Sequence, residues 1–252
     1  MHLMRVKVGG ENFLEGFSPL YVSLLKSPHW LIAGGSGSGK SVACLYWLNS
    51  LVGTNQVELW VADFKKSGDF EGISGRYAAY EDCVTLLGDY YQAFQEIKYK
   101  ETGKRIMLVF DEYSAFCVWL EQHDKAAFKR LQGYMAEILM QGRELPGGGS
   151  AWLWCLVQRP DSEYLAKGSR INYMVRICMG SVSRETKTML FDTELPENYT
   201  PRTGCGVISE DGKPIRVFTV PNVEKSRLKR LLQKKAASAA TGGAGGGAAA
   251  ST

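Results

Sequence analysis

Most of the chain shows one of two patterns of apolar and polar residues. Short apolar runs bounded by glycine or polar residues predict buried strands, at residues 30–33, 57–62, 106–110, 152–157 and 173–179, with a shorter one at 77–80. Apolar residues at three- and four-residue steps predict helices at residues 42–51, 81–99 and 125–145. Because strands and helices alternate, we expect an α/β fold, a mostly parallel sheet with helices on both faces.

The C-terminal part of the sequence has a different pattern. Two short strands at residues 205–208 and 215–220, separated by an Asp-Gly turn, predict a β-hairpin. A basic amphipathic helix is expected at residues 223–235. Residues 236–252 contain only Ala, Gly, Ser and Thr, and we expect them to form a flexible tail. The expected organisation is a short N-terminal segment (1–27), one α/β domain (28–222), the basic helix (223–235) and the tail (236–252).

Charge is distributed unevenly along the sequence. The 252 residues include 30 Lys+Arg and 26 Asp+Glu, a net charge of +4. Six basic residues and no acidic one lie between Lys225 and Lys235, so the rest of the chain is slightly acidic. Overall basicity therefore does not by itself predict nucleic-acid binding.

Cysteine spacing and hydropathy bear on zinc binding and on the cellular location of the protein. The six cysteines lack the close pairs of a zinc site, and several lie within apolar runs. This favours reduced cysteines in the core and a cytoplasmic location. No apolar run approaches the roughly 20 residues that a membrane-spanning helix needs, and residues 1–10 lack a signal-peptide pattern.

A glycine-rich segment between the first expected strand and helix carries the clearest chemical signal. Residues 34–41 match the pattern GxxxxGK[ST], whose backbone N–H groups cradle phosphate oxygens at a helix N-terminus. Lys40 would reach the β- and γ-phosphates of ATP, and the Ser41 hydroxyl would bind Mg²⁺. The expected ATP-binding residues are Gly34, Gly35, Ser36, Gly37, Ser38, Gly39, Lys40 and Ser41.

Two strand ends supply the other candidate catalytic groups. Residues 106–110 lead into Asp111 and Glu112. We expect Asp111 to bind Mg²⁺ and Glu112 to orient and polarise the attacking water, which favours hydrolysis. Gln158 follows the next strand and would lie beside Asp111, where an amide can sense the γ-phosphate. The strand at 57–62 lies between the two motifs in sequence, an order typical of RecA-like P-loop ATPases.

In these motifs the sequence resembles the motor domain of FtsK/SpoIIIE-type DNA translocases, in the wider HerA–FtsK group. The resemblance covers roughly residues 6–223. Its motifs occur in the family's order, at residues 28–41 (Pro-His to Lys-Ser), Asp63-Phe64-Lys65, Asp111-Glu112, Gly142-Arg143, Gln158-Arg159-Pro160, Asn172 to Arg176, Ser183-Arg184 and Pro201-Arg202-Thr203-Gly204. The sequence departs from the family in the Gly run at 147–149 and in the lack of an anchor, a long linker or a winged-helix module, which indicates a minimal motor.

The resemblance implies a hexameric ring that hydrolyses ATP between subunits and moves DNA independently of its sequence. An arginine from one subunit would then reach the nucleotide of the next. Arg143 is the first candidate for this role, with Arg170 and Arg184 as weaker ones. Lys65, Lys66 and the loop at 161–170, with Lys167, are candidates for gripping DNA phosphates.

Several functions share this motor, and the sequence leaves them open. The favoured one is a DNA translocase for conjugative or other mobile-element transfer, recruited by a relaxase or a membrane-anchored partner. The alternatives are a secretion-system ATPase that moves protein, a viral genome-packaging ATPase and a nucleotide-dependent scaffold without hydrolysis. The basic helix at 223–235 would contact DNA, an acidic partner or an anionic membrane surface, or would simply pack as an end helix.

Overall fold

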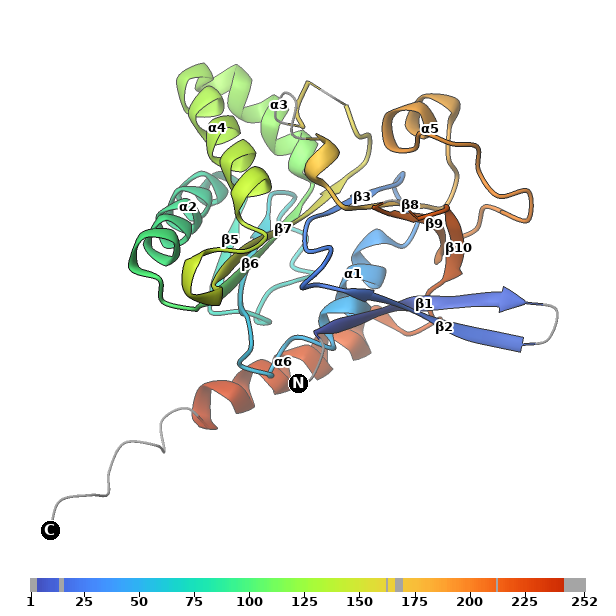
Figure 1. Ribbon diagram of the computed structural model, residues 1–252, viewed down its shortest axis with the longest axis horizontal. Coiled ribbons are helices and arrows are strands. Elements are labelled where there is room, and N and C mark those ends of the chain that lie inside the picture. The colour runs from blue at the N-terminus through green and yellow to red at the C-terminus, as the bar shows by residue number, and fades with distance from the viewer. Residues whose placement is uncertain (1–3, 14–15, 162, 166–169, 212, 243–252) are drawn as a thin grey trace, which may run out of the picture.

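One large mixed sheet organises the protein (Figure 1). The computed structural model describes residues 4–13, 16–161, 163–165, 170–211 and 213–242. Its strands are β1 (Arg5–Phe13), β2 (Gly16–Ser23), β3 (Trp30–Ala33), β4 (Glu58–Asp63), β5 (Arg76–Ala79), β6 (Arg105–Asp111), β7 (Ser150–Val157), β8 (Val175–Met179), β9 (Cys205–Glu210) and β10 (Arg216–Thr219). Its α-helices are α1 (Lys40–Leu48), α2 (Cys83–Lys100), α3 (Tyr113–His123), α4 (Lys125–Gln141), α5 (Arg184–Leu190) and α6 (Lys225–Gly242).

The sheet has a parallel half and an antiparallel half. The strand order is β2-β1-β10-β9-β8-β3-β7-β6-β4-β5. The six strands from β8 to β5 pair in parallel, and β9, β10, β1 and β2 continue the sheet by antiparallel pairing. The parallel half carries the crossover helices. The predicted α/β fold, with its C-terminal hairpin of β9 and β10, is therefore confirmed.

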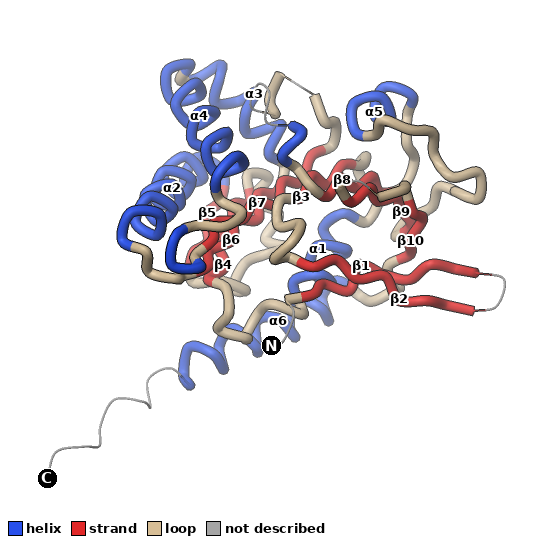
Figure 2. Tube along the Cα trace, viewed as in Figure 1, coloured by secondary structure: helices blue, strands red, loops and turns tan. Residues whose placement is uncertain are grey.

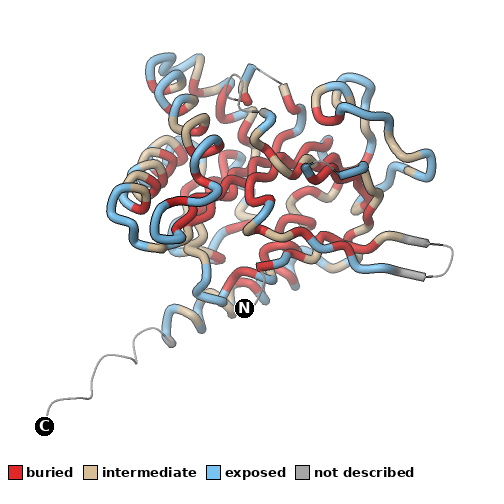
Figure 3. Tube along the Cα trace, viewed as in Figure 1, coloured by how far each residue is buried: buried red, intermediate tan, exposed pale blue. Residues whose placement is uncertain are grey.

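Helices cover both faces of the sheet because its central strands are buried on both sides. Successive side chains of a strand point to opposite faces, and in β3 Leu31 and Ala33 pack toward α2, α3 and α4. Trp30 and Ile32 pack toward α1 and α6 on the other face. Figure 3 shows the resulting continuous band of buried residues through the sheet. These two layers hold the C-terminal ends of the parallel strands in place.

The N-terminal and C-terminal ends of the described chain contain more regular structure than the sequence pattern predicts (Figure 2). Residues 1–27, expected as a short separate segment, include the β1–β2 hairpin, which joins the main sheet where Gly10 pairs with Thr219. The last helix runs from Lys225 to Gly242. The expectation of a flexible tail from residue 236 is thus wrong for residues 236–242, and residues 243–252 lie outside the described residues.

Candidate nucleotide-binding site

The loop at residues 34–39 has a backbone that requires glycine at several positions. Gly34, Gly37 and Gly39 have φ angles of 152°, 76° and 97°, which residues with a Cβ rarely adopt. A Cβ on Gly34 would also come within 2.6 Å of the Met179 carbonyl oxygen. The loop therefore folds closely over the end of β8, as the phosphate-binding pattern predicts.

The N-terminus of α1 leaves polar groups available to a bound anion. Gly39 caps the helix without any side-chain hydrogen bond, and the first turn contains no acidic residue. The Ser38 hydroxyl is buried and has no hydrogen-bond partner among the described residues. Free N–H groups at a helix N-terminus favour phosphate, so this loop fits the triphosphate of ATP.

Lys40 lies inside this loop and not in solvent. Its side chain is 7% exposed, and its ammonium donates hydrogen bonds to the carbonyl oxygens of Gly34 and Gly35. Burial lowers the pKa of Lys40, while the carboxylates of Glu112 and Asp111 act in the opposite direction. The buried cation thus lies close to the two carboxylates that follow β6.

Asp111, the last residue of β6, is a buried carboxylate near the Lys40 ammonium. It is 3% exposed, and burial, together with the nearby charges of Glu112 and Asp63, raises its pKa to about 7. Among the described residues no hydrogen bond reaches its side chain, and no group of three or more His, Cys, Asp and Glu side chains could hold a metal alone. Mg²⁺ in proteins commonly takes one or two carboxylates plus phosphate and water, so Asp111 and Ser41 fit a nucleotide-bound Mg²⁺.

Glu112 and Gln158 meet at the same edge of the sheet. Glu112 has a φ angle of 57° and precedes α3, so its side chain leaves the strand in a different direction from Asp111. The Gln158 amide, just beyond β7, donates to both Glu112 carboxylate oxygens at 3.1 Å. The structure therefore brings together Lys40, Asp111, Glu112 and Gln158.

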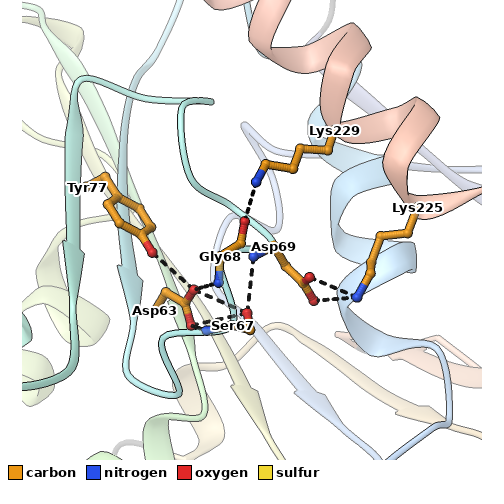
Figure 4. Close-up of polar contacts among 7 residues, drawn as sticks. All are labelled: Asp63, Ser67, Gly68, Asp69, Tyr77, Lys225 and Lys229. Atoms are coloured by element: carbon orange, nitrogen blue, oxygen red, sulfur yellow. Dashed lines mark hydrogen bonds and ion pairs between the residues drawn. The ribbon is translucent and has the colours of Figure 1, made fainter.

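Asp63 is a further site residue, whose role the sequence pattern does not reveal. It ends β4 directly opposite Asp111 in the β4–β6 register. It is fully buried, and its carboxylate accepts hydrogen bonds from Ser67 N–H at 3.1 Å, Gly68 N–H at 2.9 Å, the Ser67 hydroxyl and the Tyr77 hydroxyl at 3.1 Å (Figure 4). The sequence signals for Asp63 were its position at the end of an apolar run and its place in the family-like motif Asp63-Phe64-Lys65, neither of which shows what the carboxylate does.

The other candidates lie in different places. Arg143 is exposed and follows α4, where the Gly142 carbonyl accepts from Ala151 N–H at the start of β7. This is the edge of the sheet opposite to Lys40, so Arg143 does not complete the site within one chain. Arg184 begins α5, and Lys65 and Lys66 are exposed just beyond β4. Lys167 and the Arg170 side chain lie outside the described residues.

This fold and loop are those of a RecA-like P-loop nucleotide-binding domain, and comparison with known proteins shows which sequences and structures it resembles. The sequence profile of the FtsK/SpoIIIE family matches residues 10–85. The chain is 27% identical over 220 residues to the FtsK domain-containing protein YdcQ of Bacillus subtilis (strain 168), covering 79% of the chain and 44% of YdcQ. The resemblance to this family is confirmed, and the chain spans less than half the length of that relative.

Solved structures with the same fold include conjugation and secretion proteins. The conjugation coupling protein TcpA of pCW3, as a monomer with ATPγS, aligns with a TM-score of 0.67 and 22% identity, over 93% of this chain and 71% of TcpA. The cytoplasmic domain of the type VII secretion ATPase EccC of Thermomonospora curvata aligns with a TM-score of 0.66 and 21% identity, over 92% and 31%. No helix among the described residues is both long and apolar enough to cross a membrane.

Proposed function

We propose that this chain is the motor of a DNA translocase that hydrolyses ATP in a hexameric ring and acts in the transfer of a mobile element. ATP would be held by the loop at residues 34–39 and by Lys40, with Mg²⁺ held by Ser41 and Asp111. Mg²⁺ would neutralise charge on the transferred phosphoryl group. Glu112 would orient the attacking water and accept its proton.

The contact between Gln158 and Glu112 is the observation that carries the coupling part of this proposal. An amide that donates to both carboxylate oxygens engages the two atoms with which Glu112 would contact the attacking water. Gln158 precedes residues 161–170, which we propose contact DNA. A shift of these residues would release Glu112, so DNA binding would accelerate hydrolysis.

The test is the DNA dependence of hydrolysis in a Gln158→Ala variant. We expect Gln158→Ala to bind ATP like the wild type but to lose the stimulation by DNA, because Glu112 is no longer held by the amide. Gln122→Ala is the matched control, since Gln122 is an exposed glutamine on α3. Stimulation of the same size in Gln158→Ala would refute this coupling.

A protein-moving ATPase is the second candidate function, favoured by the structural likeness to secretion ATPases. Viral genome packaging, like mobile-element transfer, would require ATP hydrolysis that is stimulated by DNA. Hydrolysis by the wild type should be measured with double-stranded DNA, with single-stranded DNA and with an unfolded polypeptide. We expect DNA to stimulate hydrolysis and polypeptide to leave it unchanged, and the opposite result would favour protein transport.

The position of Arg143 allows a test of the ring. Because Arg143 lies at the sheet edge opposite to Lys40, we propose that it serves the nucleotide of a neighbouring subunit. Arg143→Ala subunits mixed with wild-type subunits should then reduce hydrolysis by more than their share of the mixture. Arg130→Ala is the control, since Arg130 is an exposed arginine on α4, the helix that precedes Arg143. A loss in simple proportion to Arg143→Ala content would contradict an action across subunits.

A further inference from the structure

The basic residues of α6 fall into two groups with different surroundings. Lys225, Lys229 and Lys235 each contact a backbone or side-chain oxygen of the protein body. Arg227, Arg230 and Lys234 are exposed, and among the described residues their side chains have no hydrogen-bond or ion-pair partner. Half of the positive charge of this helix is therefore used inside the molecule.

The inward group fastens α6 to the segment 64–72 between β4 and β5 (Figure 4). The Lys225 ammonium lies 2.8 Å and 2.9 Å from the two carboxylate oxygens of Asp69. The Lys229 ammonium donates to the Gly68 carbonyl oxygen at 2.5 Å, and the Gln233 amide donates to the Glu71 carbonyl oxygen at 2.8 Å. This segment contains turns but no regular helix or strand, so its contacts with α6 add to those of the buried Phe70 and of Asp63.

Gly68 forms one hydrogen bond with α6 and another with Asp63 of the nucleotide site. Its carbonyl oxygen accepts from Lys229, and its N–H donates to Asp63 at 2.9 Å. Asp63 in turn lies opposite Asp111 across the β4–β6 pairing, and Phe64 N–H donates to the Asp111 carbonyl oxygen at 3.4 Å. A continuous row of contacts thus leads from α6 to the backbone of Asp111, which carries the candidate Mg²⁺ carboxylate.

We propose that Lys229 is a positioning residue for the nucleotide site, acting through Gly68 and Asp63 on the place of Asp111. The inference rests on the proposed function for its link to Mg²⁺. The apolar residues Leu228 and Leu232 are 5% and 0% exposed, so α6 remains packed when the Lys229 contact is removed. Loss of the contact would release segment 64–72 and leave Asp111 less well placed for the cation.

The test compares Lys229→Met with Lys234→Met, the same change in the same helix at a position without a partner. In nucleotide-free protein, backbone hydrogen exchange of residues 64–72 should rise several-fold in Lys229→Met and stay at the wild-type rate in Lys234→Met. The Mg²⁺ concentration for half-maximal hydrolysis should rise about threefold to tenfold in Lys229→Met, as expected for loss of one charge-assisted hydrogen bond. The KM for ATP at saturating Mg²⁺ should stay constant, and Lys229→Arg should restore the wild-type behaviour.

The outcomes separate this inference from the proposed function. Unchanged exchange in Lys229→Met, or equal effects in Lys234→Met, would overturn the positioning role whatever the activity. A change in exchange without a change in Mg²⁺ dependence would also overturn it, because the contact would then support the segment alone. If the wild type hydrolyses no ATP with Mg²⁺ and DNA, the proposed function fails, and Mg²⁺-dependent binding of ATPγS replaces hydrolysis as the second measurement.

Discussion

Asp63 and Asp111 occupy equivalent positions on neighbouring strands and have opposite surroundings. Each ends a parallel strand, and the two are paired in register. Both are buried, at 0% and 3% exposure. Protein N–H and O–H groups surround Asp63, whereas the pKa of Asp111 rises to about 7 because burial is not offset by donors.

The difference separates a structural carboxylate from one kept for a ligand. A buried charge is costly unless it is hydrogen-bonded or paired. Asp63 meets this requirement within the protein and fixes the turn that follows β4. Asp111 does not, so the protein keeps a destabilising group where a cation would remove the cost. Stability given up at a functional site is a known pattern.

The largest expected effect is on activity, in Asp111→Asn. Removing the Mg²⁺ carboxylate should reduce ATP hydrolysis at least about 100-fold, roughly 3 kcal/mol of transition-state stabilisation. The same change should raise the melting temperature of nucleotide-free protein at pH 8, because it removes a buried carboxylate that accepts no hydrogen bond from the described residues and lies near the like charges of Glu112 and Asp63. Steady-state hydrolysis and thermal melting measure the two effects. A variant that is both inactive and less stable would show that Asp111 also supports the fold.

Asp63→Asn should have the opposite effect on stability to Asp111→Asn. The new amide group would face N–H and O–H donors, so at least one donor near it would lose its acceptor. We expect the free energy of unfolding to fall by about 2–3 kcal/mol, as measured by denaturant titration. Asp69→Asn, which changes an aspartate at the outer side of the same segment, is the comparison. If Asp63→Asn were as stable as the wild type, the contrast between the two aspartates would not hold.

The pH dependence of the free energy of unfolding tests the raised pKa of Asp111. Its folded pKa of about 7 lies above its ordinary value of 3.8, so between these values the folded state binds more protons than the unfolded state. Stability from this group is therefore lost as pH rises from about 4 to about 7. The stabilisation by Asp111→Asn, relative to the wild type, should be greatest above pH 7 and should vanish near pH 4.

The buried His29 makes this comparison with the variant necessary. Burial lowers the pKa of His29 to about 3 from 6.5, so its contribution to stability is lost as pH falls through that range. The two trends oppose each other in the wild type, whereas His29 is common to both proteins and cancels in the difference. An Asp111→Asn stabilisation that is independent of pH would contradict the raised pKa.

The smallest expected effect is that of Tyr77→Phe. It removes one of the donors to Asp63 and leaves the ring in place, so the free energy of unfolding should fall by about 1 kcal/mol. Hydrolysis at saturating Mg²⁺ should change little, because Ser67 and Gly68 still hold Asp63. The same pair of measurements, denaturant titration and hydrolysis, checks this. A large loss of activity would mean that Tyr77 acts on Asp111 more directly.

The phosphate loop and the strand ends could be predicted from the sequence because the signal is local. Residues 34–41 are contiguous, and a glycine-rich turn between an apolar strand and a helix leaves few other folds. Asp111 and Glu112 directly follow an apolar strand. The parallel order of the sheet then brings Gln158 to the same edge. Each of these predictions depends only on locating the end of one strand or helix in the sequence.

The role of Asp63 and the extent of α6 could not be predicted, because each depends on register or on packing. The donors to Asp63 come from a turn and from β5, and their convergence requires the pairing of β4 with β5. Residues 236–242 lack an apolar pattern, yet alanine has the highest helix propensity, and Ala236 packs against the core. Composition alone therefore predicted a tail where the docked helix continues.

The contact between Lys229 and Gly68 also has a consequence for biosynthesis. The two residues are separated by 161 positions in sequence, and the β1–β2 hairpin must likewise wait for β10 before it can join the main sheet. Contacts this distant form slowly and late. The phosphate loop needs β8 and Gly204 but not α6, so we expect a nascent chain to complete this loop before segment 64–72 gains its contact with Lys229. Stalled chains ending before residue 225 should show this order by hydrogen exchange.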